Sequence, residues 1–190
     1  MQRSKKIVLL SHCILNANSK IIGYSQYPGV FKEIVDIIDR LDLGMIQLPC
    51  PEILACGMKR WGKTKDQYDT KHYREMCRDI LRPVVEQIYA YDKVGYEIVG
   101  VIGVDGSPSC GVNKTCLGKS QYGSISNFKT IEEIADSIIE ADDPGIFMEE
   151  FMQLLTDEGF QLPFIGINEE DVFDSIESVE NFLVSHTEAQ

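Results

Sequence analysis

Three cysteines follow short apolar segments of the sequence, and their thiols are the groups around which chemistry could be organised. The segments and their cysteines are 7–10 with Cys13, 45–48 with Cys50, and 98–104 with Cys110. The apolar, β-branched run 98–104 is typical of a strand that is buried on both faces of a sheet. If these strands are parallel neighbours, the three thiols meet beyond their carboxyl ends, where open α/β sheets bind ligands.

Three converging thiolates suit two kinds of metal group. They can bind three irons of a 4Fe-4S cluster and leave the fourth iron open to water or substrate, or they can bind a zinc ion with one open position. Spacing alone does not choose between these groups. The sequence has no Cys-x-x-Cys pair, which excludes the usual zinc-ribbon, ferredoxin and thioredoxin signatures. The glycines of 103–111 fit neither common phosphate-binding pattern.

Acid–base side chains stand close to these cysteines in the sequence. Glu52 is two residues after Cys50. The side chains that flank Cys110 are Asp105, Ser107 and Ser109. A carboxylate and a hydroxyl could therefore act on a ligand at an open metal position. Glu52 could equally be an ordinary carboxylate in the first turn of a helix.

The remaining cysteines and one histidine have simpler interpretations. Cys77 lies on an apolar stripe with helical spacing, so we predict that it is a core residue. Cys56 and Cys116, in polar loops with glycine, stay open as secondary candidates. His12 precedes Cys13, but strand alternation turns its side chain away, which favours a structural role.

The elements that position these groups alternate between strands and helices. The segment 163–167 is a fourth strand, and helices are predicted over 29–43, 71–93, 131–138, 146–158 and 171–184. This alternation indicates a parallel sheet with right-handed crossovers and helices on both faces. We predict one α/β domain over 1–190, a three-layer sandwich of the flavodoxin or Rossmann type. The strand order 2-1-3-4 would bring the three cysteine loops together.

Two polar segments are expected to form walls of a ligand pocket. The segment 14–28, which contains Asn16, is long for a connection between a strand and a helix, and such loops are often functional. The segment 53–70 has no regular period and contains Trp61, the only tryptophan. Trp61 could stack on a flat heterocycle or simply pack at the surface.

Composition limits the class of ligand. The chain has 190 residues, 44% apolar residues and a net charge of −12. The negative charge disfavours binding to nucleic acid and favours a small-molecule ligand. No apolar run is long enough for a membrane helix or a secretory signal, which predicts a cytoplasmic location without membrane attachment. A homodimer is compatible with the sequence but is not specified by it.

In combination, three motifs resemble those of the TudS family of thiouracil desulfidases in their order and spacing. They are the strand end with Cys13, Cys50-Pro51-Glu52, and Gly106-Ser107-Pro108-Ser109-Cys110-Gly111. The resemblance spans roughly the first two thirds of the chain.

The resemblance implies an oxygen-sensitive, non-redox desulfidase. Its ligands to a 4Fe-4S cluster would be Cys13, Cys50 and Cys110, and the open iron would capture the sulfur of a thiolated pyrimidine. Water would replace the sulfur at the carbon atom, with Glu52 and Ser107 as catalytic residues. Further pocket residues, expected from their positions in the sequence, are Ser109, Asp105, Asn16 and Trp61.

Two segments depart from the family pattern. Ile14 to Gly23 replaces a stretch that ends in Tyr-Asp-Gly, and Ala55 to Trp61 replaces Gly-Gly-Leu-Pro. Both are expected pocket loops, so the thio-substrate need not be thiouracil. Three alternatives stay open: a cluster-bearing sulfur carrier or sensor without turnover, a zinc-dependent hydrolase with the same thiolates, and a flavodoxin-like binding domain with incidental cysteines.

Overall fold

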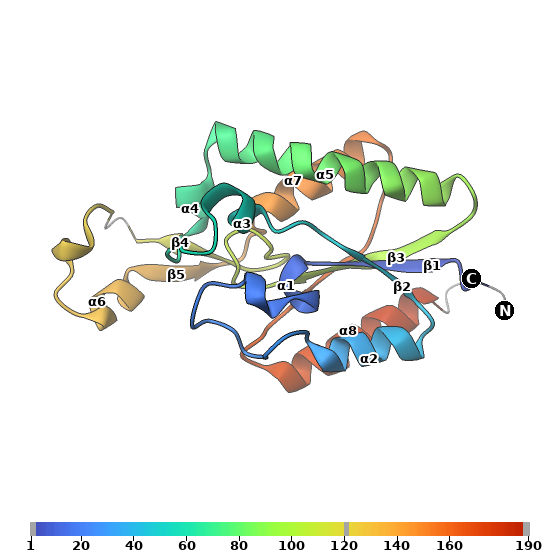
Figure 1. Cartoon of the computed structure of the whole chain (residues 1–190), viewed down its shortest axis with the longest axis horizontal. Helices are drawn as coiled ribbons and strands as arrows, with labels where there is room; N and C mark the ends of the chain where they lie inside the picture. Colours follow the sequence, from blue (N-terminus) through green and yellow to red (C-terminus); the bar gives the residue numbers. More distant parts are fainter. Residues whose placement is uncertain (1–2, 120–121, 188–190) are drawn as a thin grey trace.

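Four parallel strands form the central sheet of the protein, in the order β2-β1-β3-β6 (Figure 1). The structure is a computed structural model that describes residues 3–119 and 122–187. The strands of this sheet are β1 (Lys6–Leu10), β2 (Gly44–Gln47), β3 (Glu97–Val104) and β6 (Phe164–Ile167). The predicted α/β class, the parallel pairing and the strand order 2-1-3-4 are confirmed.

Helices cover both faces of the sheet and make the predicted three layers (Figure 1). One face carries α5 (Lys71–Asp92) and α7 (Ile146–Asp157), and the other carries α2 (Lys32–Arg40) and α8 (Val172–Thr187). In β1, Leu9 packs with the α5 and α7 side chains, whereas Val8 and Leu10 pack on the opposite side. Because successive side chains of a strand alternate between faces, a fully apolar strand joins the two cores.

Short elements surround the carboxyl edge of the sheet. They are α1 (His12–Leu15), the 3-10 helix η1 (Ala17–Ser19), α3 (Pro51–Cys56) and α4 (Lys65–Tyr68). These short helices lie in or next to the segments 14–28 and 53–70, which show no regular hydrophobic period. Helices of four to six residues are too short to display such a period, so the sequence does not reveal them.

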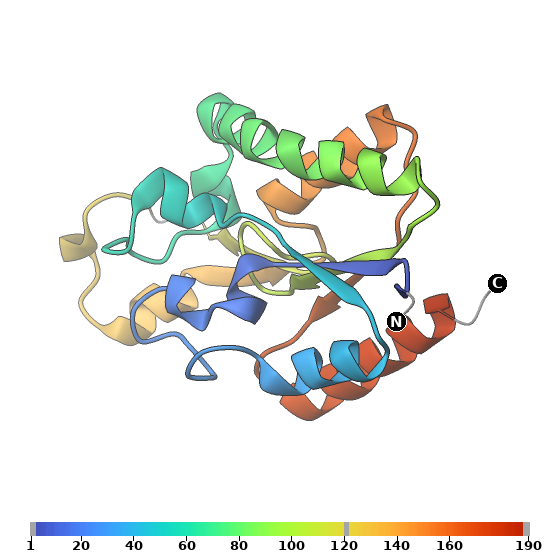
Figure 2. The same cartoon turned by 45° about the vertical axis from the view of Figure 1, so that its right-hand side comes forward.

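A second, antiparallel sheet of two strands projects beside this edge (Figure 2). It pairs β4 (Thr115–Gly118) with β5 (Ile138–Ala141), and the connection holds η2 (Ile125–Asn127) and α6 (Ile131–Asp136). The predicted helix over 131–138 is therefore too long, since it ends at Asp136. The β-branched pair Ile138 and Ile139 instead continues into a strand whose partner, β4, lies more than twenty residues earlier in the sequence.

No helix within the described residues is long and apolar enough to cross a membrane. The fully buried Cys77 lies in the core between α5 and the sheet, as its helical spacing predicts.

Glycine at position 145 lets α7 approach the loop of Cys110. A Cβ atom on Gly145 would lie 2.4 Å from the carbonyl carbon of Ser109 and 2.8 Å from its nitrogen. Because these are backbone atoms, such a contact can be relieved only by a shift of the main chain. We expect Gly145→Ala to lower the free energy of unfolding by about 1–3 kcal/mol, measured by urea denaturation.

The matched control is Gly29→Ala, because a Cβ atom there meets nothing within 4 Å. Its stability should stay within about 0.5 kcal/mol of the wild type. Equal stability of the two variants would contradict the close packing of α7 against the cysteine loop.

Candidate functional site

The register of the sheet aligns the segments that carry the first two cysteines. Leu10 pairs with Gln47 on one side and with Ile102 on the other. Cys13 and Cys50 each lie three residues beyond a member of this row. Both therefore emerge at the same level of the carboxyl edge, one at the start of α1 and the other immediately before α3.

A tight turn brings Cys110 back to the end of β3. The carbonyl oxygen of Cys110 accepts a hydrogen bond of 2.9 Å from the Val104 nitrogen. The Ser107 hydroxyl oxygen accepts from the nitrogens of Cys110, at 3.0 Å, and of Ser109, at 3.3 Å. The side chain of Ser107, a predicted catalytic residue, therefore stabilises the turn that carries Cys110.

Asp105 organises the chain that follows this turn. Its Oδ1 accepts hydrogen bonds from the nitrogens of Val112 at 2.8 Å and Asn113 at 2.9 Å. A Cβ atom on Gly166 would lie 2.1 Å from the same oxygen, so β6 leaves room for the carboxylate only because it has glycine there. This predicted pocket residue therefore binds the protein's own backbone.

The three thiols lie close enough together to influence one another electrostatically. The pKa of Cys13 is raised to about 12, mainly by burial, with smaller contributions from charges on Glu169 and Cys50. Burial likewise raises the pKa of Cys50. For Cys110, burial raises the pKa far above its usual range, and charges on Cys13 and Cys50 add to this effect. The register of the strands and these effects place the three cysteines near one another at the carboxyl edge, and their role as ligands of one group stays a prediction.

Ser11 adds a hydrogen-bond donor at this point. Its side chain is fully buried, and its hydroxyl oxygen has no hydrogen-bond partner within normal limits among the described residues. Burial raises the pKa of Cys110, and the nearby Ser11 hydroxyl is the smallest of its causes and acts in the opposite direction. An unpaired buried donor beside three thiols fits a group whose sulfur atoms accept hydrogen bonds, as an iron–sulfur cluster does.

Glu52 stands beside the thiols in a polar cluster of its own. Its Oε2 forms an ion pair with Nε of Arg60 at 3.0 Å, and its Oε1 accepts a 3.0 Å hydrogen bond from the Ser109 hydroxyl. The side chains of Glu52 and Arg60 are only 12% and 3% exposed. A charge on Glu52 also contributes to the raised pKa of Cys110, after burial and the two other thiols. The carboxylate is therefore near the thiol group.

A second ion pair lies on the Cys13 side. Lys20 and Glu169 are paired with 9% and 8% of their side chains exposed. The Tyr27 hydroxyl is 2.6 Å from Oε1 of Glu169 and 3.3 Å from the carbonyl oxygen of Cys13. The positive charge of Lys20 partly offsets the effect of burial on the pKa of Cys13.

Other candidates from the sequence lie around this centre. Asn16 caps η1, where its side chain accepts a hydrogen bond from the Asn18 nitrogen. Trp61 is 76% exposed. Lys63 is near both secondary thiols: its Nζ is 3.5 Å from Sγ of Cys56, and its carbonyl oxygen is 3.9 Å from Sγ of Cys116. The His12 ring pairs with the Leu48 carbonyl oxygen, a structural contact.

A cavity of about 420 Å³ adjoins the Cys13 side of the centre. Its lining includes Lys20, Tyr27, Ile21 and Met58. A larger cavity of about 660 Å³ lies around Tyr91 and Tyr96, where β3 begins, at the edge of the sheet opposite the thiols. Its position gives it no contact with the cysteine loops.

Sequence reasoning missed several residues of the site. No sequence motif indicated a role for Arg60, Tyr73, Lys20 or Glu169. Ser109 was expected to line a pocket rather than to contact Glu52. These contacts join residues that are 8 to 149 positions apart. Arg60 is one of eight Lys and Arg residues within 59–82, and this clustering of positive charge is the one sequence feature that points to it.

The arrangement offers three thiols, a carboxylate, a guanidinium and several hydroxyls at one edge of the sheet. Among the residues that the structure describes, no group of three or more His, Cys, Asp or Glu side chains is placed to hold a single metal ion. A 4Fe-4S cluster has a different geometry, because each cysteine binds a different iron.

Comparisons with known proteins give one informative match. The uncharacterized protein MJ0003 of Methanocaldococcus jannaschii is 42% identical over 112 residues, which are 59% of this chain and 71% of the relative. No protein-family model matches the chain. No solved structure matches it.

The raised pKa of the partly buried Cys13 thiol predicts an alkaline loss of stability in the metal-free protein. Its pKa is about 12 in the folded chain and 9.0 for an ordinary cysteine. The folded state therefore keeps a proton that the unfolded chain releases. This contribution to stability is fully present below pH 9 and is lost as pH rises from 9 to 12.

Urea denaturation of the metal-free protein across this range should show a smaller loss of stability for Cys13→Ala than for the wild type. Identical pH dependence in the two proteins would contradict the burial of an ionisable thiol at this position.

Proposed function

The chain belongs to the family of the uncharacterized protein MJ0003 of Methanocaldococcus jannaschii, and we propose from its site that it is an iron–sulfur-dependent desulfidase. The proposed reaction replaces the sulfur of a thiocarbonyl group in a small molecule, such as a thiopyrimidine, with the oxygen of water. One C=S group and one water give one C=O group and hydrogen sulfide. No oxidant or reductant is needed.

One observation carries the proposal: three cysteine thiols lie at one edge of the sheet, next to the carboxylate of Glu52. Cys13, Cys50 and Cys110 supply three ligands, which leaves one iron of a 4Fe-4S cluster without a protein ligand. Glu52 supplies the nearby proton acceptor. The unpaired hydroxyl of Ser11 supplies a donor to sulfur.

When bound, the cluster would supply a sulfur-seeking Lewis acid. The carboxylate of Glu52 would orient a water molecule toward the thiocarbonyl carbon and accept one of its protons. Arg60 holds the second carboxylate oxygen at 3.0 Å and keeps the carboxylate fixed. Ser107 would contribute mainly by holding Cys110, since its oxygen accepts two backbone hydrogen bonds in the turn.

The charge of the chain supports a small, uncharged substrate. The net charge is −12, and the two cations nearest the thiols, Arg60 and Lys20, are already paired with carboxylates. An anionic ligand such as nucleic acid would gain little from this surface. Six free cysteines are consistent with a reducing compartment, so we place the proposed activity in the cytoplasm.

The first test is the composition of protein purified without oxygen. The wild type should be brown and contain about four irons and four acid-labile sulfides per chain. Cys110→Ala should lose most of both, because each cysteine binds a separate iron. Cys77→Ala is the control, since this cysteine is buried in the core away from the sheet edge and should leave the content unchanged.

A colourless wild type that cannot be reconstituted with iron and sulfide would exclude the proposed function. Activity of that colourless protein with bound zinc would favour a hydrolase with the same thiolates.

The second test separates an enzyme from a sulfur carrier. Glu52→Gln should keep the iron and sulfide content but lower the rate of sulfide release from thiolated bases about 10²- to 10⁴-fold, because it removes the proton acceptor. Glu33→Gln is the matched control, because Glu33 is an exposed glutamate in the first turn of α2. If Glu52→Gln retains full function, the protein acts by binding sulfide without turnover.

A further inference from the structure

Two buried hydroxyl groups connect Glu52 to the interior of the protein. The Ser109 Oγ atom is 3.0 Å from Oε1 of Glu52 and 2.9 Å from the hydroxyl oxygen of Tyr73. Ser109 is fully buried and Tyr73 is 5% exposed. The three residues come from α3, the cysteine turn and α5, so this chain of contacts links separate parts of the fold.

The chemistry of the groups fixes the direction of both hydrogen bonds. An ionised carboxylate can only accept, so the single proton of the Ser109 hydroxyl is donated to Glu52. Ser109 then has no proton for Tyr73, and the Tyr73 hydroxyl must donate to the Ser109 oxygen. Such consecutive bonds strengthen one another in a region of low dielectric.

The chain of hydroxyls ends at Tyr73. In the described part of the chain, Ser109 is the only hydrogen-bond partner of the Tyr73 hydroxyl. The Tyr73 ring is buried in the core and stacks on the Tyr68 ring, with 4.6 Å between the two ring centroids. Burial raises the pKa of Tyr73 well above its usual range, so this hydroxyl keeps its proton. A hydroxyl that keeps its proton can act as a fixed donor to Ser109.

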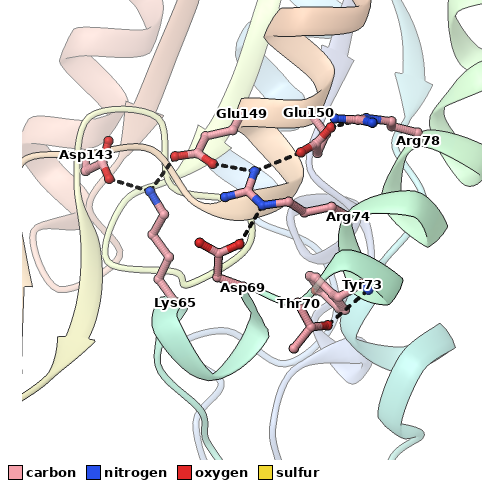
Figure 3. Close-up of polar contacts among 9 residues, drawn as sticks. All are labelled: Lys65, Asp69, Thr70, Tyr73, Arg74, Arg78, Asp143, Glu149 and Glu150. Atoms are coloured by element: carbon pink, nitrogen blue, oxygen red, sulfur yellow. Dashed lines mark hydrogen bonds and ion pairs between the residues drawn. The ribbon is translucent and has the colours of Figure 1, made fainter. Parts of the chain in front are cut away.

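An ionic network anchors the first turn of α5, from which Tyr73 projects (Figure 3). Arg74 is 2.9 Å from Glu149 and 2.8 Å from Glu150 of α7, and 2.5 Å from Asp69. Lys65 is paired with the same Glu149 at 2.5 Å. The Thr70 hydroxyl accepts a hydrogen bond from the Tyr73 nitrogen. The backbone of Tyr73 is therefore held from two sides.

We infer that Tyr73 and Ser109 are positioning residues that, with Arg60, fix the orientation of the Glu52 carboxylate toward the thiol group. This role rests on the proposed function for its effect on turnover. Ser109 orders Oε1 and Arg60 orders Oε2, so both oxygens are held before a substrate binds. A reaction that depends on a directed carboxylate loses rate when that direction is lost.

The test compares Tyr73→Phe, Ser109→Ala and the double variant in protein loaded with iron and sulfide. Each variant should lower kcat for sulfide release about 10- to 100-fold with KM within about twofold, because substrate binding is not altered. The double variant should be no slower than Ser109→Ala, since the two hydroxyls act through one bond to Glu52. Tyr89→Phe is the control, an exposed tyrosine on the same helix.

A second measurement does not depend on turnover. In protein with ¹³C-labelled glutamate carboxyls, the infrared band absent from Glu52→Gln identifies the carboxylate stretch of Glu52. This band should shift in Tyr73→Phe and in Ser109→Ala and stay in place in Tyr89→Phe. A merely structural role of Tyr73 would not move it.

Unchanged kcat and an unmoved infrared band in Tyr73→Phe would overturn the inference while the desulfidase proposal stands. A wild type that binds no cluster or releases no sulfide would overturn the proposed function. In that case the infrared band still decides whether Tyr73 orients Glu52.

Discussion

The placement of three partly buried thiols at the carboxyl edge of the sheet is the constraint on which the rest of the site depends. Each buried thiol resists ionisation, and a negative charge on one raises the pKa of another. Ligation to the proposed cluster would require the ionised sulfur, so binding of the cluster would have to offset both effects. The thiols are stable as neutral groups without it.

Close backbone packing holds the third thiol at this edge. The turn of Cys110 is fixed from within by Ser107 and from outside by α7, whose first residues donate backbone hydrogen bonds to Pro108 and Ser109. The absence of a side chain at Gly145 permits this approach. The ionic pairs between α5 and α7 then connect the position of the turn to the position of Tyr73. One packing arrangement thus serves both the thiol and the carboxylate.

The sequence predicted the sheet and the thiols because both follow from local patterns. β1 and β3 are apolar along most of their length because both of their faces are covered, whereas the edge strand β2 is largely exposed. A parallel sheet places the carboxyl ends of its strands together, so the strand order and the placement of Cys13, Cys50 and Cys110 at one edge could be inferred. The contacts of Glu52 could not. Ser109 lies 57 positions away, and Arg60 is separated from Glu52 by the bend after α3. No periodic pattern encodes such contacts, and β5 was missed for the same reason, since its partner is distant.

The two segments that depart from the desulfidase pattern are physically coupled. Arg60, from the second segment, donates a 2.7 Å hydrogen bond to the Ser19 carbonyl oxygen of the first and also holds Glu52. Ile21 and Met58, one from each segment, line the same cavity of about 420 Å³ beside the Cys13 side of the site. A change in one segment alone would disturb this cavity wall and the carboxylate together. Residues of both segments therefore form one wall of this cavity, and Arg60 connects that wall to Glu52.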